Sequence, residues 1–262
     1  MPRPIWSGAI SFGLVNVPVK LFSAVSPKDV RFHQLDARSK SRVRQKRVSA
    51  TTGDEVPFDE IVKGYELSPD TYVTITPSEL DSLDPKATKS IDIEDFVDLD
   101  QIDPVYYERP YYLVPDKGGI KAYVLLREAM RETNKVGIAR VVLRTKQYLA
   151  AVRPKGNALV LETMLFADEV VPPDELDLPD TDEVEVTPRE EKMARQLIDS
   201  LTTDFEPSKY RDEYRERVLD LIEQKAAGQE IVVHETADEA PKVVDLMAAL
   251  EASLAAVKQS RD

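Results

Sequence analysis

Apolar and polar residues alternate in several short segments of the chain, a pattern typical of half-buried β-strands. Residues 10–14 alternate in this way and residues 15–21 continue with the opposite parity, which predicts one strand with a bulge or bend near Leu14 and Val15. Further extended segments are predicted at 72–75, 91–97, 141–152 and 158–166. Between the last two lies Pro154-Lys155-Gly156-Asn157, a turn signal that predicts a hairpin.

Helical spacing of apolar residues appears in other segments. One helix is predicted from Lys121 to Val136, with Gly137 as its stop. A second helix is predicted to open at Thr187, whose hydroxyl can cap it while Glu190 completes a capping box. Both helices are therefore bounded by recognisable signals.

Two more helices are predicted towards the C-terminus. One follows Pro207 and ends near Gly228. Residues 229–241 lack periodicity and are typical of a linker, and residues 243–254 form a short amphipathic helix. Such a helix could dock on a partner or cap its own domain, and the sequence leaves both alternatives open.

The order of these elements predicts the fold class. Strands with one intervening helix come first and helices follow, which indicates an α+β protein that is mainly β. We expect a β-rich core at residues 1–186, a helical arm at 187–228, and a linker with a C-terminal segment at 229–262.

Composition excludes several kinds of site. The 262 residues include no cysteine and only two histidines, His33 and His234, so disulfides and thiolate metal sites are excluded and a zinc site is disfavoured. No apolar run reaches the roughly 18 residues that a membrane helix needs, and residues 1–8 lack a signal-peptide core. We expect a cytoplasmic protein with no membrane contact, no metal and no cofactor.

Charge is distributed in alternating blocks. The net charge of the chain is −13, yet residues 1–50 carry +8 and residues 111–160 carry +7. Residues 51–110 and 161–262 carry −12 and −16. This distribution indicates a shaped positive surface within an acidic protein, and therefore a polyanionic partner.

The densest basic segment is RSKSRVRQKR, residues 38–47. If it is extended, the basic residues at even positions point to one face, roughly 6.6–6.8 Å apart. Residues Arg140, Arg144 and Lys146 repeat this arrangement in a second segment. Positive charge on an exposed edge strand can also serve only to prevent aggregation, but arginine-rich rows on two distant segments favour phosphate binding.

The type of nucleic acid follows from what these segments lack. They contain no helix-turn-helix or zinc-finger spacing, and residues 38–47 contain no aromatic residue on which single-stranded bases could stack. We therefore expect duplex DNA to be bound through its phosphates without sequence preference. The predicted DNA contacts are Arg38, Lys40, Arg42, Arg44, Lys46, Arg47, Lys117, Arg140, Arg144, Lys146, Arg153 and Lys155.

Two other functions are compatible with parts of the sequence. A metal-dependent nuclease could use Asp92, Glu94 and Asp95, but a strand with a charged outer surface explains these acids better. An acidic scaffold whose basic segments contact a protein is the third interpretation. No glycine-rich nucleotide-binding motif and no catalytic triad signature occur, so we expect no catalytic residues and no enzymatic activity.

Five stretches, in order along almost the whole chain, carry a family resemblance. They are IWSGAISFGLVNVPVKLFSA (5–24), VKGYEL (62–67), IEDFVDLDQIDPVYYERPYYLVPD (93–116), AYVLLREAMRETNKVGIARVVLR (122–144) and DEYRERVLDLIEQK (212–225). Together they resemble the prokaryotic Ku proteins of bacterial non-homologous end joining. The resemblance implies a homodimer in which two β-barrel cores and their bridging segments close a ring that threads onto DNA ends.

The resemblance also implies roles for the C-terminal third. In that family the helical arm wraps around the partner subunit, which implies a shared core containing Leu197, Leu201, Tyr210, Tyr214 and Leu221. The C-terminal segment of that family recruits DNA ligase D. The corresponding apolar face would contain Val244, Leu246, Met247, Leu250 and Leu254.

Overall fold

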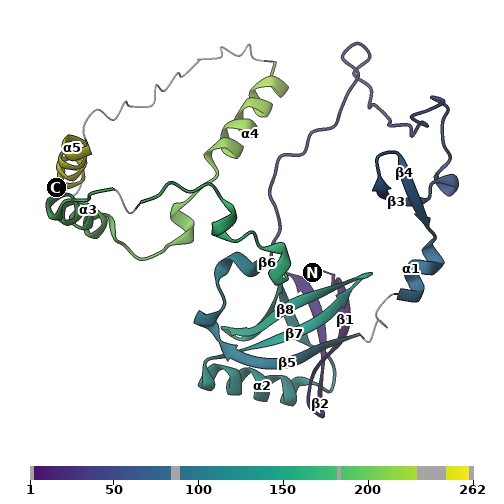
Figure 1. Ribbon diagram of the computed structural model, residues 1–262, viewed down its shortest axis with the longest axis horizontal. Helices are drawn as coiled ribbons and strands as arrows, with labels where there is room; N and C mark the ends of the chain where they lie inside the picture. Colours follow the sequence, from purple (N-terminus) through teal and green to yellow (C-terminus); the bar gives the residue numbers. More distant parts are fainter. Residues whose placement is uncertain (1–2, 84–88, 182–183, 229–245, 260–262) are drawn as a thin grey trace. The chain divides into compact units, whose positions relative to one another are not determined.

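The computed structural model describes residues 3–83, 89–181, 184–228 and 246–259. The chain divides into two compact units, Met1–Lys28 with His33–Pro172 and Asp29–Phe32 with Pro173–Asp262 (Figure 1). Within the described ranges, the first unit contains a closed β-barrel and the second contains α-helices. No helix in these ranges is long and apolar enough to cross a lipid bilayer.

Seven strands of the described chain form the barrel, in the order β1-β2-β6-β9-β8-β7-β5. Their bounds are β1 (Trp6–Phe12), β2 (Val15–Ser23), β5 (Ser90–Asp98), β6 (Tyr107–Pro115), β7 (Lys135–Leu143), β8 (Lys146–Lys155) and β9 (Ala158–Met164). Neighbouring strands are antiparallel except β1 and β5, whose parallel pairing closes the barrel. The predicted mainly β fold with a helical C-terminal arm is confirmed.

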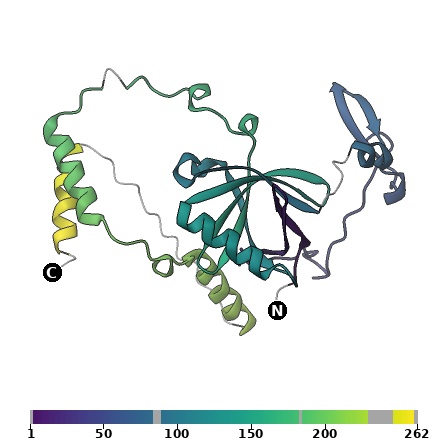
Figure 2. The same cartoon turned by 90° about the horizontal axis from the view of Figure 1, so that it is seen from below.

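The barrel interior is an apolar core because one face of each strand carries aliphatic side chains. The fully buried members include Ile10, Val17, Val19, Leu21, Ile91, Leu113, Val141, Val152, Leu159 and Leu161. Helix α2 (Ile120–Thr133) packs against the barrel in both views (Figures 1 and 2) and contributes Tyr123, Leu126 and Met130 to the same core. Spacings of three and four residues place these three on one helical face.

The seam between β1 and β5 depends on a close backbone approach. The amide of Ala9 donates a hydrogen bond of 3.0 Å to the carbonyl oxygen of Lys89. A Cβ atom added at Gly8 would collide with that carbonyl and with the ring of Trp6. Glycine at position 8 therefore allows the barrel to close.

An excursion, residues 33–83, lies between β2 and β5 in the sequence. It contains a 3-10 helical turn at Phe58–Glu60, the hairpin of β3 (Lys63–Ser68) and β4 (Thr71–Ile75), and helix α1 (Pro77–Leu83). Strand β4 was predicted, whereas β3 was not. Most of the excursion is solvent-exposed, so its side chains are available to a partner.

A second, smaller cluster lies outside the barrel interior. Between β5 and β6 the chain forms 3-10 helical turns at Leu99–Gln101 and Pro104–Tyr106. Apolar residues of this connection pack against outward-facing residues of β7, β8 and β9; the members include Val97, Ile102, Tyr106, Tyr107, Val136, Ala151 and Met164. This part of the outer surface is thus covered by the chain itself.

The second unit contains α3 (Pro188–Leu201), α4 (Glu213–Ala226) and α5 (Leu246–Gln259), with 3-10 turns at Pro173–Glu175 and Pro207–Lys209. Another 3-10 turn, Ala167–Glu169, follows β9 in the first unit. Helices α3 and α5 lie side by side in both views (Figures 1 and 2), and Arg189 and Glu251 form an ion pair of 3.1 Å between them.

The predicted capping box at the start of α3 is confirmed. The Thr187 hydroxyl accepts a hydrogen bond from the amide of Glu190, and the Glu190 carboxylate accepts one of 2.8 Å from the amide of Thr187. These hydrogen bonds also lower the pKa of Glu190, chiefly through the Thr187 hydroxyl. The capping box therefore satisfies the amides of Thr187 and Glu190.

Two predicted continuous strands are instead hairpins. The bend predicted near Leu14 is a turn between β1 and β2, in which Phe12 lies opposite Val15 and Gly13 has a φ of 57°. The extended segment predicted at 141–152 is interrupted between β7 and β8, because the chain reverses after Leu143. The parity change in the sequence reflected a reversal of direction rather than a bulge.

Helix ends also differ from the prediction. Helix α2 ends at Thr133 because Asn134 adopts the left-handed conformation, with φ 51° and ψ 38°. Gly137, the predicted stop, lies within β7 and is buried. Helix α4 begins after its cap residue Asp212, later than the predicted start after Pro207.

Candidate nucleic-acid interface

The basic segment 38–47 does not form one continuous ladder. Residues 37–39 form a turn, in which the Asp36 carboxylate accepts hydrogen bonds from the Arg38 amide and the Ser39 hydroxyl. These bonds, the hydroxyl first, lower the pKa of Asp36. Lys40 follows with a φ of 55°. The prediction that Arg38 and Lys40 continue an extended row is therefore wrong in its geometry.

The remainder of the segment runs between two turns. Arg42 pairs with Leu35 in an isolated antiparallel bridge, and the next turn begins after Val48, which pairs with Glu55. Arg42 and Arg44 lie on this run, are exposed, and make no ion pair among the described residues. Their guanidinium groups are therefore available to a phosphate, as is that of the exposed Arg38 in the preceding turn.

The end of the segment makes contacts within the excursion. Lys46 forms an ion pair of 2.5 Å with Glu55, and the Arg47 guanidinium lies 5.2 Å from the ring centroid of Phe58. Both side chains stay at the surface, so the contacts orient rather than bury them. Exposed ion pairs of this kind contribute little to stability.

Three predicted contacts on the barrel already have acidic partners. Arg140 on β7 lies 3.4 Å from Glu94 on β5, and Lys146 lies 3.9 Å from Glu169. Arg153 on β8 forms an ion pair of 2.5 Å with Glu162, and their side chains are only 25% and 11% exposed. Of the three, Arg153 fits a structural role best, because a largely buried carboxylate requires its charge.

The other predicted barrel contacts have no ion pair in the described chain. Lys117 follows β6, Lys155 ends β8, and Arg144 occupies the turn between β7 and β8. The sequence predicts that Arg140, Arg144 and Lys146 share one strand face. This prediction is wrong for Arg144, because the chain reverses at this residue. Its φ of 61° is a conformation that glycine or asparagine usually occupies in a two-residue hairpin turn.

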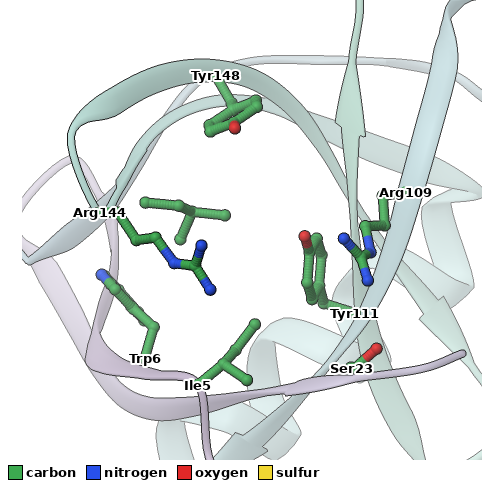
Figure 3. A pocket seen from close by; sticks show the side chains of 8 residues that line it. Ile5, Trp6, Ser23, Arg109, Tyr111, Arg144 and Tyr148 are labelled. Carbon is green, nitrogen blue, oxygen red and sulfur yellow. The ribbon is translucent and has the colours of Figure 1, made fainter. Parts of the chain in front are cut away.

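Arg144 points instead into a cavity of about 220 Å³ at one end of the barrel (Figure 3). The lining residues are Ile5, Trp6, Ser23, Arg109, Tyr111, Leu143, Arg144 and Tyr148. The guanidinium of Arg109 lies beside the Tyr111 ring, 5.9 Å from its centroid. Sequence reasoning missed Arg109 and this cavity, although Arg109 lies in the aromatic-rich stretch YERPYY.

The acids of the nuclease interpretation do not form a metal site. Asp92 accepts hydrogen bonds from Ser90, and Glu94 pairs with Arg140. A bulge between Ile93 and Asp95 interrupts the alternation of β5, and Asp95 is exposed. In the described ranges, no group of three or more acidic or histidine side chains could hold a metal ion. The nuclease interpretation is therefore not supported.

The residues implied for a shared core are mostly exposed in the single chain. Leu201, Tyr210 and Tyr214 are 57%, 68% and 73% exposed. Leu197 is half-buried and Leu221 is exposed. Tyr210 lies before α4 rather than on its face, and its ring stacks on Phe205 at 5.8 Å between centroids.

The C-terminal apolar residues divide into two groups. Met247, Leu250 and Leu254 are half-buried on α5, which packs against α3, whereas Leu246 is exposed. Val244 lies outside the described residues. Of the two alternatives that the sequence left open, the structure shows α5 docked within its own chain.

Comparison with known proteins covers most of the chain. A family model described as "Ku70/Ku80 beta-barrel domain" matches residues 11–193. A curated protein from Anaeromyxobacter sp. (strain K), named "Non-homologous end joining protein Ku", is 51% identical over all of this chain and 88% of its own length. Proteins of the same name from Coxiella burnetii and Archaeoglobus fulgidus are 44% and 43% identical, over 96% and 98% of this chain and 94% and 100% of their own lengths.

Proposed function

The chain belongs to the Ku family of non-homologous end joining proteins, and we propose that it binds the ends of broken double-stranded DNA as a ring-shaped homodimer and recruits DNA ligase D. The observation that carries the proposal is the family match over the barrel together with relatives similar along the full chain. The protein itself acts by binding rather than by catalysis.

The exposed basic residues support sequence-independent binding. Arg42 and Arg44 are exposed and without ion pairs among the described residues, and Arg38, Lys40, Lys117 and Lys155 are exposed as well. Phosphate contacts fix a protein on a duplex but carry no sequence information. We assign this function to the core at residues 1–186.

Exposed apolar side chains support the homodimer. On α3, α4 and their connection, Ile198, Leu201, Phe205, Tyr210 and Tyr214 are each more than half exposed. Monomeric proteins rarely expose so many large apolar residues close together in sequence. A second copy of the arm at residues 187–228 would cover them, and two-fold pairing makes the same surface available on both subunits.

Ring closure explains how weak contacts could select ends. A closed ring holds DNA only if an end is threaded through it, and the duplex then leaves only by sliding off. Nonspecific phosphate contacts would otherwise bind internal DNA as well as ends. Threading therefore converts sequence-blind binding into end binding.

The test compares a linear duplex with a covalently closed circle of the same sequence in a gel-shift competition at fixed salt. We expect the linear duplex to bind and the closed circle to compete far more weakly. Linearising the circle with a restriction enzyme serves as the matched control and should restore competition. Equal affinity for both forms would contradict threading.

The C-terminal segment at 229–262 is assigned to the ligase. Since Met247, Leu250 and Leu254 are half-buried on the helix that packs on α3, the exposed Leu246 is the better first variant. We expect Leu246→Asp to reduce stimulation of DNA ligase D without changing DNA binding. Unchanged stimulation would place the contact elsewhere on the segment, which removal of residues 246–262 would test.

A further inference from the structure

The two ends of the barrel differ in how they are filled. Strand β6 runs from the cavity at Arg109 and Tyr111 to Leu113, where helix α2 supplies Tyr123 to the core. The α2 end is therefore packed with apolar side chains, whereas the other end contains a cavity with two arginines. Mouths of β-barrels are among the preferred positions of small-molecule sites.

The cavity collects its residues from five strands and one turn. Trp6 begins β1 and Ile5 directly precedes it, Ser23 ends β2, and Leu143 ends β7. Arg109 and Tyr111 lie on β6, Tyr148 lies on β8, and Arg144 is in the turn. No acidic residue is among the lining residues.

Both arginines lack an acidic partner. Neither Arg109 nor Arg144 forms an ion pair or a side-chain hydrogen bond within the described ranges. The nearby carboxylate of Glu108 accepts a hydrogen bond from Thr163 and does not line the cavity. In addition, Lys146 lies with its ammonium 5.1 Å from the ring centroid of Tyr148. Lys146 also lies 3.9 Å from Glu169, so the positive charge left without an acidic partner in the described part of the chain is that of the two arginines.

The backbone of Arg144 strengthens the case for a ligand. A left-handed conformation strains a residue that has a bulky side chain, and glycine would avoid this strain. Arg144 adopts it with a φ of 61° in a turn where no packing requires an arginine, since the side chain is exposed. The conformation directs the guanidinium into the cavity (Figure 3).

We propose that this cavity binds a phosphate monoester joined to a planar ring, as in a 5′-nucleotide. A phosphate monoester carries about −1.5 to −2 charges at pH 7, which matches two guanidinium groups better than a single carboxylate does. The partly exposed rings of Trp6 and Tyr148 offer stacking surfaces for a base. The volume of about 220 Å³ admits the phosphate and part of its substituent rather than a large cofactor.

The same chemistry has two sources, a free nucleotide and the 5′-phosphorylated terminus of a DNA strand. The site itself does not depend on the proposed end-binding function, because it is tested with small molecules alone. If the small molecules do not bind, the proposed DNA-end binding still stands. If linear and circular DNA bind equally, the proposed phosphate site still stands.

The single tryptophan of the chain makes the cavity directly observable. Trp6 lines it, so a change in tryptophan fluorescence reports on this position alone. The probes are ribose 5-phosphate, deoxyadenosine 5′-monophosphate and deoxyadenosine, with equilibrium dialysis of labelled deoxyadenosine 5′-monophosphate as a second readout. We expect saturable binding of both phosphates and at least roughly tenfold weaker binding of the nucleoside.

Arg144→Gly is the decisive variant, because glycine suits the left-handed backbone and the fold should be retained. We expect it to weaken binding of the phosphates about tenfold or more. Lys89→Gly is the matched control, since it also removes an exposed cation at positive φ, here 46°, but does not line the cavity. It should bind as the parent does.

Absence of saturable binding by both fluorescence and dialysis overturns the proposal, as does an Arg144→Gly variant that binds as tightly as the parent. The source is then identified by competition against labelled deoxyadenosine 5′-monophosphate. Stronger competition by a duplex with 5′-phosphates than by the same duplex with 5′-hydroxyls identifies the DNA terminus. Equal competition identifies the free nucleotide.

Discussion

The hydroxyl of Tyr123, on helix α2, donates a hydrogen bond of 2.7 Å to the carbonyl oxygen of Leu113 on strand β6. The same hydroxyl accepts a hydrogen bond of 2.6 Å from the amide of Leu159 on β9. Leu113 and Leu159 are paired residues of the two strands, so the hydroxyl bridges the ladder at the point where the helix packs. All three residues are buried, which makes these hydrogen bonds costly to lose.

Tyr123→Phe should therefore lower the free energy of unfolding by about 1–3 kcal/mol, because it leaves a buried amide and a buried carbonyl without their shared partner. Urea unfolding monitored by circular dichroism measures the change. The exposed Tyr112 on β6 provides the control, and Tyr112→Phe should stay within about 0.5 kcal/mol of the parent. Equal stability of the two variants would contradict the assigned role.

Alkaline pH should destabilise the protein through the same residue. Burial raises the pKa of Tyr123 above its usual value of 10.0, partly offset by the Leu159 amide. The folded state thus holds the phenolic proton more tightly than the unfolded state does. The stabilisation is fully present below pH 10 and is lost as the pH rises through the folded pKa. The urea midpoint should decrease between pH 8 and a pH above 10, and this decrease should be smaller for Tyr123→Phe than for the parent.

Replacing Arg42 and Arg44 with glutamine should weaken binding to duplex DNA by a similar factor for every sequence. Loss of two phosphate contacts should flatten the slope of log affinity against log salt by about 1.8. Binding measured by fluorescence anisotropy at several salt concentrations gives both quantities. Arg195→Gln, which removes an exposed cation from α3, is the control and should leave the slope unchanged.

Arg153→Gln should affect stability rather than the salt dependence of DNA binding. Its partner Glu162 is largely buried, so removal of the guanidinium should cost about 1–3 kcal/mol of unfolding free energy. Denaturant unfolding and a DNA salt titration on the same preparation separate the two effects. An unchanged stability combined with a flatter salt slope would instead show that Arg153 contacts phosphate.

Tyr214→Asp should shift the protein from dimer to monomer. The side chain is 73% exposed in the single chain, and a buried aspartate at a two-fold interface would introduce an unpaired charge on each subunit. Sedimentation velocity at several concentrations measures the distribution. If the parent itself sediments as a monomer throughout, the proposed homodimer is wrong; Arg195→Gln should behave as the parent.

Local signals in the sequence were enough to predict several elements. The hairpin between β8 and β9 follows from Gly156 and its neighbours, and the start of α3 follows from Thr187 and Glu190. In these cases the residues that specify the conformation lie next to one another in the chain. Alternation of apolar residues likewise predicted most barrel strands.

Other features depended on residues that carry no usual signal. Arg144 and Thr145 form a tight turn without glycine or asparagine, so the reversal between β7 and β8 was missed. Asn134, rather than Gly137, ends α2 because it adopts the left-handed conformation. Asn134 and Gly137 could each end the helix, and the packing of Gly137 within β7 left Asn134 as the residue that ends it.

The cavity could not be predicted because its members are separated along the sequence. Trp6 and Arg109 come together only when β1, β2 and β6 pair, and Arg144 joins them only through its turn. Charge counting did identify Arg144, but it placed the side chain on the wrong surface. Ion pairs such as Arg153 with Glu162 are equally invisible to a count of charges.

The parallel pairing of β1 with β5 has a consequence for how the protein is made. Strand β1 (Trp6–Phe12) leaves the ribosome before the other barrel strands, but its second neighbour, β5 (Ser90–Asp98), is synthesised only after the whole excursion. The last strand of the cylinder ends at Met164, so closure must wait for that residue. Such distant pairings slow folding, and the earliest strand is exposed to aggregation or to chaperones during translation.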